Sequence, residues 1–155
     1  MITYLQGDAT EPAGDGPKIL CQICNDTGGW GKGFVVAISR RWKAPENAYR
    51  DWYQHREEND FALGAVQFVP ATDMIEVANM IGQHGTRSKQ GEPPIRYEAV
   101  RECLRQVGEH AVRRSASLHM PRIGCGLAGG EWSEIEKILG ETIPAEVAVT
   151  VYDFE

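Results

Sequence analysis

A strand-like segment that runs into a glycine-rich turn and then into a helix occurs twice in this sequence, and this pattern restricts the fold most. The clearer copy spans residues 120–132 and contains four glycines, Gly124, Gly126, Gly129 and Gly130. The other copy spans residues 25–33. Such turns expose backbone N–H groups and the positive end of a helix, which suits phosphate groups. Each loop alone could be a tight strand-to-helix turn, but the pair predicts a ligand with phosphates and sugars held between them.

Strand-like and helix-like periodicities alternate along the rest of the chain. Strands are expected at residues 2–6, 18–24, 63–69, 74–81, 117–123 and 146–152. Helices are expected at 34–41, from Pro45 onward, at about 94–114 and at 131–141, with a polar loop at 82–91. This order predicts a three-layer α/β/α domain around a central mixed sheet of about six strands. Both glycine loops then fall at the C-terminal ends of strands, where such sheets bind ligands.

Length, composition and charge narrow the class of protein. With 155 residues, 42% of them hydrophobic, the chain is expected to form a single domain over 1–155. It has no apolar run of roughly 18 residues and no signal-like N-terminus, so we expect a cytoplasmic protein without a membrane partner. The net charge is −6, and Lys137 is the one basic residue among seven acidic ones after residue 126. This balance argues against broad nucleic-acid affinity, but it allows recognition of a modified nucleotide in a pocket.

Two of the four cysteines, Cys21 and Cys24, have the spacing of a redox or zinc motif. Positions three apart on a strand point to opposite faces, and no second cysteine pair or histidine pair completes a zinc site. We therefore expect reduced, packed thiols and no metal, with metal binding as the weaker alternative.

Four segments, taken together and in this order, resemble a macrodomain, the ADP-ribose-binding module. They are residues 5–10, 23–33, 120–132 and 149–153, so the resemblance covers essentially the whole chain. Pro-Arg-Ile-Gly-Cys-Gly-Leu at 121–127 and Gly-Gly-Trp-Gly-Lys-Gly at 28–33 resemble one branch of the family most. That branch contains the terminal ADP-ribose protein glycohydrolases and the ADP-ribose 1″-phosphate phosphatases.

The resemblance implies a role for each matching residue at the adenine end of the ligand. Asp8 would accept a hydrogen bond from the adenine amino group, assisted by the Ala9 N–H, and Tyr152 would pack against the adenine. A carboxylate suits this position because it only accepts, whereas the exocyclic amine only donates. The alternatives are that Asp8 is a turn or cap residue and Tyr152 an ordinary strand tyrosine.

The resemblance also implies which residues hold the other end of the ligand. Asn25 would hold the hydroxyls of the distal ribose, and Gly31, Gly33 and Phe34 would line that ribose and the pyrophosphate. The second glycine loop would close over the diphosphate with its backbone: Ile123, Gly124, Cys125, Gly126, Leu127 and Ala128. Glycine is needed here because a side chain would keep the backbone away from the phosphate oxygens.

The chain departs from the family pattern at two catalytic positions. Glycohydrolases of this branch use a lysine after the fourth strand and an aspartate in the second glycine loop. Here the aspartate position is Ala128, and the lysine position falls near Gln83 or His84. A covalent lysine mechanism is therefore not expected, and Lys32 and Lys89 are interpreted as solvated surface lysines.

Hydrolysis could still proceed with a positioned water that attacks the distal ribose. Asn25 or Asp26, together with a phosphate of the ligand, would hold this water, and His84 could serve as acid or base. Asp26 could equally cap the turn at Thr27–Gly28, and His84 could be a solvent-facing loop residue. The catalytic candidates are Asn25, Asp26 and His84.

Two classes of function stay open. The favoured one is a monomeric mono-ADP-ribosyl hydrolase without a cofactor, whose partners are ADP-ribose and ADP-ribosylated protein or DNA. It would act on carboxylate-linked protein modification or on modified thymidine in DNA. ADP-ribose 1″-phosphate phosphatase and O-acetyl-ADP-ribose deacetylase are neighbouring activities of the same pocket. The other class is a reader that binds ADP-ribose without chemistry, which the missing lysine and aspartate favour.

Overall fold

Six strands form one sheet in the computed structural model, which describes residues 2–154. They are β1 (Ile2–Gln6), β2 (Lys18–Asn25), β3 (Val66–Pro70), β4 (Ile75–Gln83), β5 (Ser117–Met120) and β6 (Val149–Asp153). Their order in the sheet is β1-β6-β5-β2-β4-β3. All neighbours are parallel except β3, which pairs antiparallel with β4 at one edge. The predicted mixed six-stranded sheet is confirmed.

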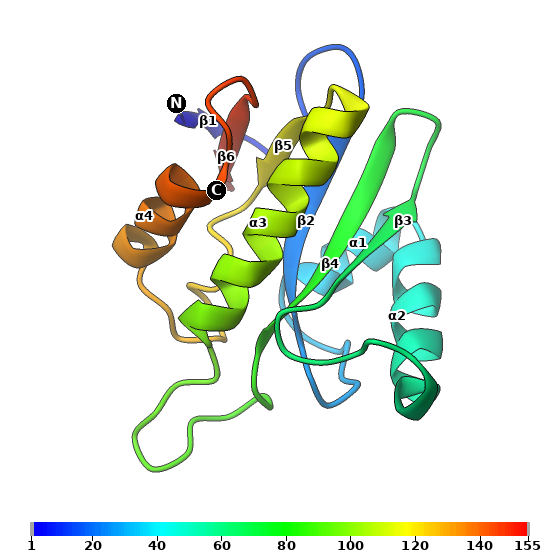
Figure 1. The fold of residues 1–155 in the computed structure, drawn as a ribbon, viewed down its shortest axis with the longest axis vertical. Helices are drawn as coiled ribbons and strands as arrows, with labels where there is room; N and C mark the ends of the chain where they lie inside the picture. Colours follow the sequence, from blue (N-terminus) through cyan, green and yellow to red (C-terminus); the bar gives the residue numbers. More distant parts are fainter. Residues whose placement is uncertain (1, 155) are drawn as a thin grey trace.

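Helices cover both faces of this sheet, as the alternation of elements predicted (Figure 1). Helices α3 (Tyr97–Arg114) and α4 (Trp132–Thr142) pack on one face, and α1 (Phe34–Arg41) and α2 (Ala44–Gln54) pack on the other. A short 3₁₀ turn, Arg56–Glu58, follows α2. The three-layer α/β/α architecture is therefore confirmed.

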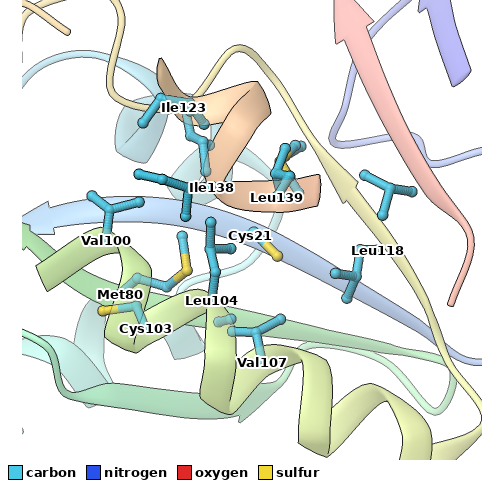
Figure 2. Packing of buried hydrophobic residues seen from close by; sticks show 14 of the residues in the cluster. Cys21, Met80, Val100, Cys103, Leu104, Val107, Leu118, Ile123, Ile138 and Leu139 are labelled. Atoms are coloured by element: carbon cyan, nitrogen blue, oxygen red, sulfur yellow. The ribbon is translucent and has the colours of Figure 1, made fainter. Parts of the chain in front are cut away.

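Two hydrophobic clusters, one on each face, hold the layers together. The larger one joins α3 and α4 to the sheet through side chains such as Met80, Leu104 and Leu118 (Figure 2). Cys21 belongs to this cluster and Cys24 to the opposite one, as the two-residue period of a strand predicts. Burial, with a smaller effect of the neighbouring Cys103, raises the pKa of the Cys21 thiol to about 12.

Two element boundaries next to the glycine loops differ from the sequence prediction. Strand β5 ends at Met120 instead of residue 123. Pro121 follows it, and proline has no N–H to donate to a neighbouring strand. Strand β4 continues to Gln83, so the loop predicted to begin at Gly82 begins two residues later.

Other boundaries shift by a few residues for local reasons. Helix α3 begins at Tyr97 instead of about residue 94, because Arg96 is extended and follows two prolines. Strand β6 begins at Val149 instead of 146, because the Val147 N–H closes a turn on the Pro144 carbonyl. Strand β3 begins at Val66 instead of 63.

The order of the strands decides which loops meet. Strands β5, β2 and β4 are adjacent and parallel, so their C-terminal ends lie at the same edge of the sheet. The second glycine loop, the first glycine loop and the segment 84–94 leave the sheet there, in this order.

Candidate ligand-binding site

A cavity of about 580 Å³ lies at this edge, within the size range of small-molecule sites. Nine of the predicted binding residues line it: Asn25, Gly31, Gly33, Phe34, Ile123, Gly124, Gly126, Leu127 and Ala128. Six predicted site residues are not part of its lining: Asp8, Ala9, Asp26, His84, Cys125 and Tyr152. The structure thus brings together the predicted ribose and diphosphate residues, and it places the predicted adenine residues elsewhere.

Asn25 organises the first glycine loop. Its Oδ1 accepts hydrogen bonds from the N–H groups of Thr27 and Gly29, each at 3.0 Å, and its Nδ2 donates to the Gly29 carbonyl at 2.9 Å. The buried Tyr49 hydroxyl lies 2.6 Å from the Asn25 carbonyl and accepts the Gly28 N–H at 3.1 Å. One hydrogen of the Asn25 amide is left to contact a ligand.

The start of α1 points backbone donors at the cavity. Gly33 precedes the helix with a φ of +86°, a conformation that favours glycine, and no side chain caps the helix. Gly31, Gly33 and Phe34 line the cavity, and their N–H groups have no acceptor within residues 2–154. The predicted combination of a bare loop and a helix N-terminus is therefore present here.

The second glycine loop folds on itself and leaves donors free. The Gly129 N–H donates to the Gly126 carbonyl at 3.0 Å, and the Gly130 N–H donates to the Gly124 carbonyl at 2.7 Å. The N–H groups of Gly126, Leu127 and Ala128, which line the cavity, have no acceptor in the described chain. They form a group of donors for an anion.

The helix that follows this second loop does not contribute its positive end. Helix α4 begins at Trp132, and neither Glu131 nor Trp132 lines the cavity. The Glu131 N–H instead donates to the Tyr97 hydroxyl at 3.0 Å. The prediction that this helix start also faces the ligand is wrong, because the loop turns back before the helix begins.

Charge at the cavity is positive, although the protein carries a net charge of −6. Lys32, Arg87 and Arg122 line it, and no aspartate or glutamate of the described residues does. Arg122 is bound to Asp153 through two hydrogen bonds of 2.6 and 3.0 Å, whereas Lys32 and Arg87 form no ion pair within residues 2–154. The cavity therefore favours an anionic ligand.

Asp26 and His84, two of the three catalytic candidates, contact each other and directly follow Asn25 and Gln83, which line the cavity. Asp26 Oδ2 lies 2.7 Å from His84 Nδ1, and Asp26 Oδ1 accepts the Gly85 N–H at 2.8 Å. The alternative role of Asp26 as the cap of the Thr27–Gly28 turn is wrong, because Asn25 caps that turn. The His84 side chain is 48% exposed, so its second ring nitrogen is accessible.

The predicted adenine residues take part in local structure. Asp8 Oδ1 accepts hydrogen bonds from the N–H and hydroxyl of Thr10, at 2.8 and 2.7 Å, as in the turn alternative. Burial acts to raise the Asp8 pKa, but these two hydrogen bonds and the charge of Arg41 together outweigh it, so the pKa is lowered. Ala9 is 3% and Tyr152 is 4% exposed, and both pack in the cluster beneath α1 and α2. Asp8 Oδ2 accepts no hydrogen bond within residues 2–154 and lies 3.9 Å from Arg41 Nη2, with the Asp8 side chain 34% exposed.

Several cavity residues were not among the predicted binding residues. Gln83, one of the two residues near the expected lysine position, lines the cavity, as do Gln22, Trp30, Thr86 and Arg87. Gln22 is a polar residue inside an apolar strand, which is a signal that the sequence contained. Its Nε2 donates to Asn79 Oδ1 at 2.7 Å, and its Oε1 is buried without a partner. Thr86 and Arg87 lie in a polar loop without periodicity, where no sequence signal marks them.

Residues 2–154 contain neither a membrane-spanning helix nor a cluster of metal-binding side chains. No helix in residues 2–154 is both long and apolar enough to cross a membrane. The same residues contain no cluster of three or more His, Cys, Asp or Glu side chains that could hold a metal ion.

The Macro domain family model matches residues 22–139, which include both glycine loops. The chain belongs to the Macro domain family. A solved structure of a Bacteroides thetaiotaomicron protein of unknown function is 57% identical, with a TM-score of 0.95, over 99% of this chain and 98% of that one. A macrodomain protein from Streptomyces coelicolor is 51% identical, with a TM-score of 0.88, over 99% of each chain.

Curated relatives of this Macro domain protein are more distant. An ADP-ribose 1″-phosphate phosphatase of Candida albicans is 25% identical over 91% of this chain and 93% of its own length. The mouse chromodomain-helicase-DNA-binding protein 1-like is 29% identical over 89% of this chain. The chain spans only 16% of the mouse protein and 14% of its zebrafish counterpart.

Proposed function

We propose that this Macro domain protein binds ADP-ribose and is a mono-ADP-ribosyl hydrolase. It would release ADP-ribose from modified protein carboxylates or from modified thymidine in DNA. The observation that carries this proposal is the group of N–H donors at Gly126, Leu127 and Ala128, which have no acceptor within residues 2–154. They face a cavity whose lining in this range includes three cations and no carboxylate. A diphosphate is both an anion and a strong acceptor, so it matches this lining.

The proposed orientation of the ligand follows the roles that the family resemblance implies. The diphosphate lies between the glycine loops, the distal ribose lies beside the free amide hydrogen of Asn25, and the adenine extends toward Asp8. This orientation leaves the distal C1″ near the rim where Asp26 and His84 meet.

The residues at the rim support attack by water. The lysine position of the related glycohydrolases falls near Gln83 or His84, and their aspartate position is Ala128, so the chain has neither the lysine nor the aspartate. Because a carboxylate only accepts, a neutral His84 ring donates its proton from Nδ1 to Asp26 and has Nε2 as an acceptor. The C1″–O bond breaks with its electron pair on the leaving carboxylate, water forms the new bond to C1″, and His84 Nε2 takes the proton of the water.

Release of free ADP-ribose tests the proposal. The protein is incubated with glutamate-linked ADP-ribosylated protein and, separately, with ADP-ribosylated single-stranded DNA, and the products are separated chromatographically. Release from either substrate supports a hydrolase and identifies the linkage. Binding of ADP-ribose without release from either substrate at high enzyme concentration would indicate that the protein is a reader without catalytic activity. Absence of ADP-ribose binding would contradict the proposal as a whole.

A second activity is favoured by the two cations without an ion pair, Lys32 and Arg87. Positive charge at the rim would suit a terminal phosphate, and the Candida albicans relative is named an ADP-ribose 1″-phosphate phosphatase. Incubation with ADP-ribose 1″-phosphate and measurement of inorganic phosphate tests this alternative in the same preparation.

A further inference from the structure

A chain of hydrogen bonds runs from β5 through β6 to the segment between β1 and β2. Ser117 Oγ lies 2.7 Å from His119 Nε2, and His119 Nδ1 lies 2.7 Å from the Tyr152 hydroxyl. The Ala13 N–H donates to the same hydroxyl at 2.8 Å. His119 is 2% and Tyr152 is 4% exposed, so these bonds are shielded from water.

The donor and the acceptor of each hydrogen bond in this series can be assigned. Ala13 N–H can only donate, so the Tyr152 oxygen accepts from it and the Tyr152 hydrogen goes to His119 Nδ1. His119 is then neutral, with its proton on Nε2 donated to Ser117. The other tautomer would leave the Tyr152 hydrogen without an acceptor within residues 2–154.

The charged surroundings of His119 maintain this state. The titratable groups that face it are Tyr152 on β6 and Lys18 on β2, whose Nζ donates to the Gly16 carbonyl at 3.1 Å. Burial, and secondly the positive charge of Lys18, lower the pKa of His119 to about 4. A second ring proton would add charge beside Lys18 and would leave Tyr152 facing a donor.

The hydrogen-bonded chain ends on the segment that carries Asp8. The Gly7 N–H donates to the Asp153 carbonyl at 3.0 Å, which fixes the start of this segment. The Arg41 Nε donates to Thr10 Oγ1 at 2.8 Å, and Thr10 holds the Asp8 carboxylate. The Ala13–Tyr152 bond fixes the segment on the other side of Thr10.

We infer that neutral His119 is a positioning residue for the purine end of the ligand: acting through the Tyr152 hydroxyl, it fixes residues 7–16 and thereby the direction of the Asp8 carboxylate. This inference rests on the proposed function, because Asp8 can read a purine only if ADP-ribose binds. His119 itself does not touch the ligand.

The ability of the protein to distinguish two purines tests the inference. Hypoxanthine has a carbonyl oxygen where adenine has its amine, so a fixed carboxylate accepts a hydrogen bond from adenine and repels hypoxanthine. Dissociation constants for ADP-ribose and inosine diphosphate ribose are measured by calorimetry at neutral pH. We expect the wild type to prefer ADP-ribose by about tenfold or more.

The variants separate positioning from stability. Tyr152→Phe and His119→Leu remove the hydrogen bonds, and the preference for ADP-ribose should fall to within about twofold. His119→Asn retains an acceptor at the position of Nδ1 and should restore much of the preference. His110→Asn alters another buried histidine, which binds Glu76 and stacks on Phe68, and it should leave the preference unchanged.

The results test the proposed function and the positioning role of His119 separately. If the wild type fails to bind ADP-ribose, the proposed function is wrong. If it binds both ligands equally, or if Tyr152→Phe keeps the wild-type preference while both affinities fall together, the positioning role of His119 is wrong. His119→Leu could fail to fold, and Tyr152→Phe then decides, because it keeps the buried ring.

Discussion

Asp26 Oδ2 lies 2.7 Å from His84 Nδ1, although the two residues are 58 positions apart in the chain. Asp26 follows β2 and His84 follows β4, and these strands are parallel neighbours in the sheet. The second carboxylate oxygen of Asp26 accepts the Gly85 N–H, so one side chain joins the loops that follow β2 and β4.

Exchange of Asp26 for asparagine should slow hydrolysis without weakening binding. In Asp26→Asn, Oδ1 still accepts the Gly85 N–H, but the amide nitrogen donates to His84 Nδ1 and moves the ring proton to Nε2. We expect release of ADP-ribose to fall about 100-fold, with the affinity for ADP-ribose within about twofold of wild type. Lys89→Ala, an exposed change in the same loop, is the control. An unchanged rate of ADP-ribose release in Asp26→Asn would show that the Asp26–His84 pair takes no part in hydrolysis.

Two glycines of the second loop should respond differently to substitution. A Cβ on Gly126 meets no atom within 4 Å, whereas a Cβ on Gly124 would overlap Ile95 Cδ1, and the φ of Gly124 is +75°. Gly126→Leu should abolish ADP-ribose binding and change the unfolding free energy by less than about 0.5 kcal/mol. Gly124→Ala should lower the unfolding free energy by about 1–3 kcal/mol. Calorimetry measures the affinity for ADP-ribose, and urea denaturation measures the unfolding free energy. Tight binding by Gly126→Leu would show that the diphosphate does not bind at this loop.

Asp8 has a structural role and a proposed binding role that can be separated. Asp8→Asn keeps an Oδ1 that accepts both hydrogen bonds from Thr10, but it places an amide donor where the adenine amine would donate. We expect the affinity for ADP-ribose to fall about tenfold with little change in stability, whereas Asp8→Ala should lower both. Wild-type affinity in both variants would show that Asp8 does not contact the base.

The Tyr49 hydroxyl should stabilise the first glycine loop. Tyr49→Phe leaves the half-buried Gly28 N–H and the Asn25 carbonyl without this partner, which costs about 1–3 kcal/mol of unfolding free energy. Tyr53→Phe is the matched control, because the Tyr53 hydroxyl makes no hydrogen bond within residues 2–154, and it should be neutral. Equal urea midpoints for the two variants would contradict this prediction.

The unfolding free energy should fall at acidic pH because His119 is neutral in the folded protein. Its pKa is lowered from 6.5 to about 4 in the folded protein, so between these values the unfolded chain binds a proton that the folded protein does not. The contribution of His119 to the unfolding free energy is fully present above pH 6.5 and is lost as the pH falls toward 4. The loss is at most about 3 kcal/mol. Urea denaturation between pH 7 and 4.5 should show a smaller loss for His119→Asn than for the wild type, and identical losses would refute this.

Much of the fold could be predicted because the signals are local. The two-residue period of β2 placed Cys21 and Cys24 on opposite faces, and the glycines placed both loops at strand ends. Boundaries were less accurate where backbone hydrogen bonds to distant residues decide them. The C-terminal end of β4 at Gln83, for example, depends on pairing with β2.

The candidate site could be predicted only in part, because sequence patterns do not say which loop faces which. Asn25 and the second loop line the cavity as expected, but Tyr152 is buried and α4 begins away from the cavity. Arg87 lines the cavity only because β4 lies next to β2 and brings its loop there.

The sequence by itself determined the strands, the helices and the two bare-backbone loops, because periodicity and the lack of a glycine side chain act within a few residues. Only the tertiary structure decided that Asp26 meets His84, that His119 reaches Ala13 through Tyr152, and that among residues 2–154 three cations but no carboxylate line the cavity. Those relationships depend on the order β5-β2-β4 and on side chains meeting across the sheet, at distances along the chain that no local pattern records.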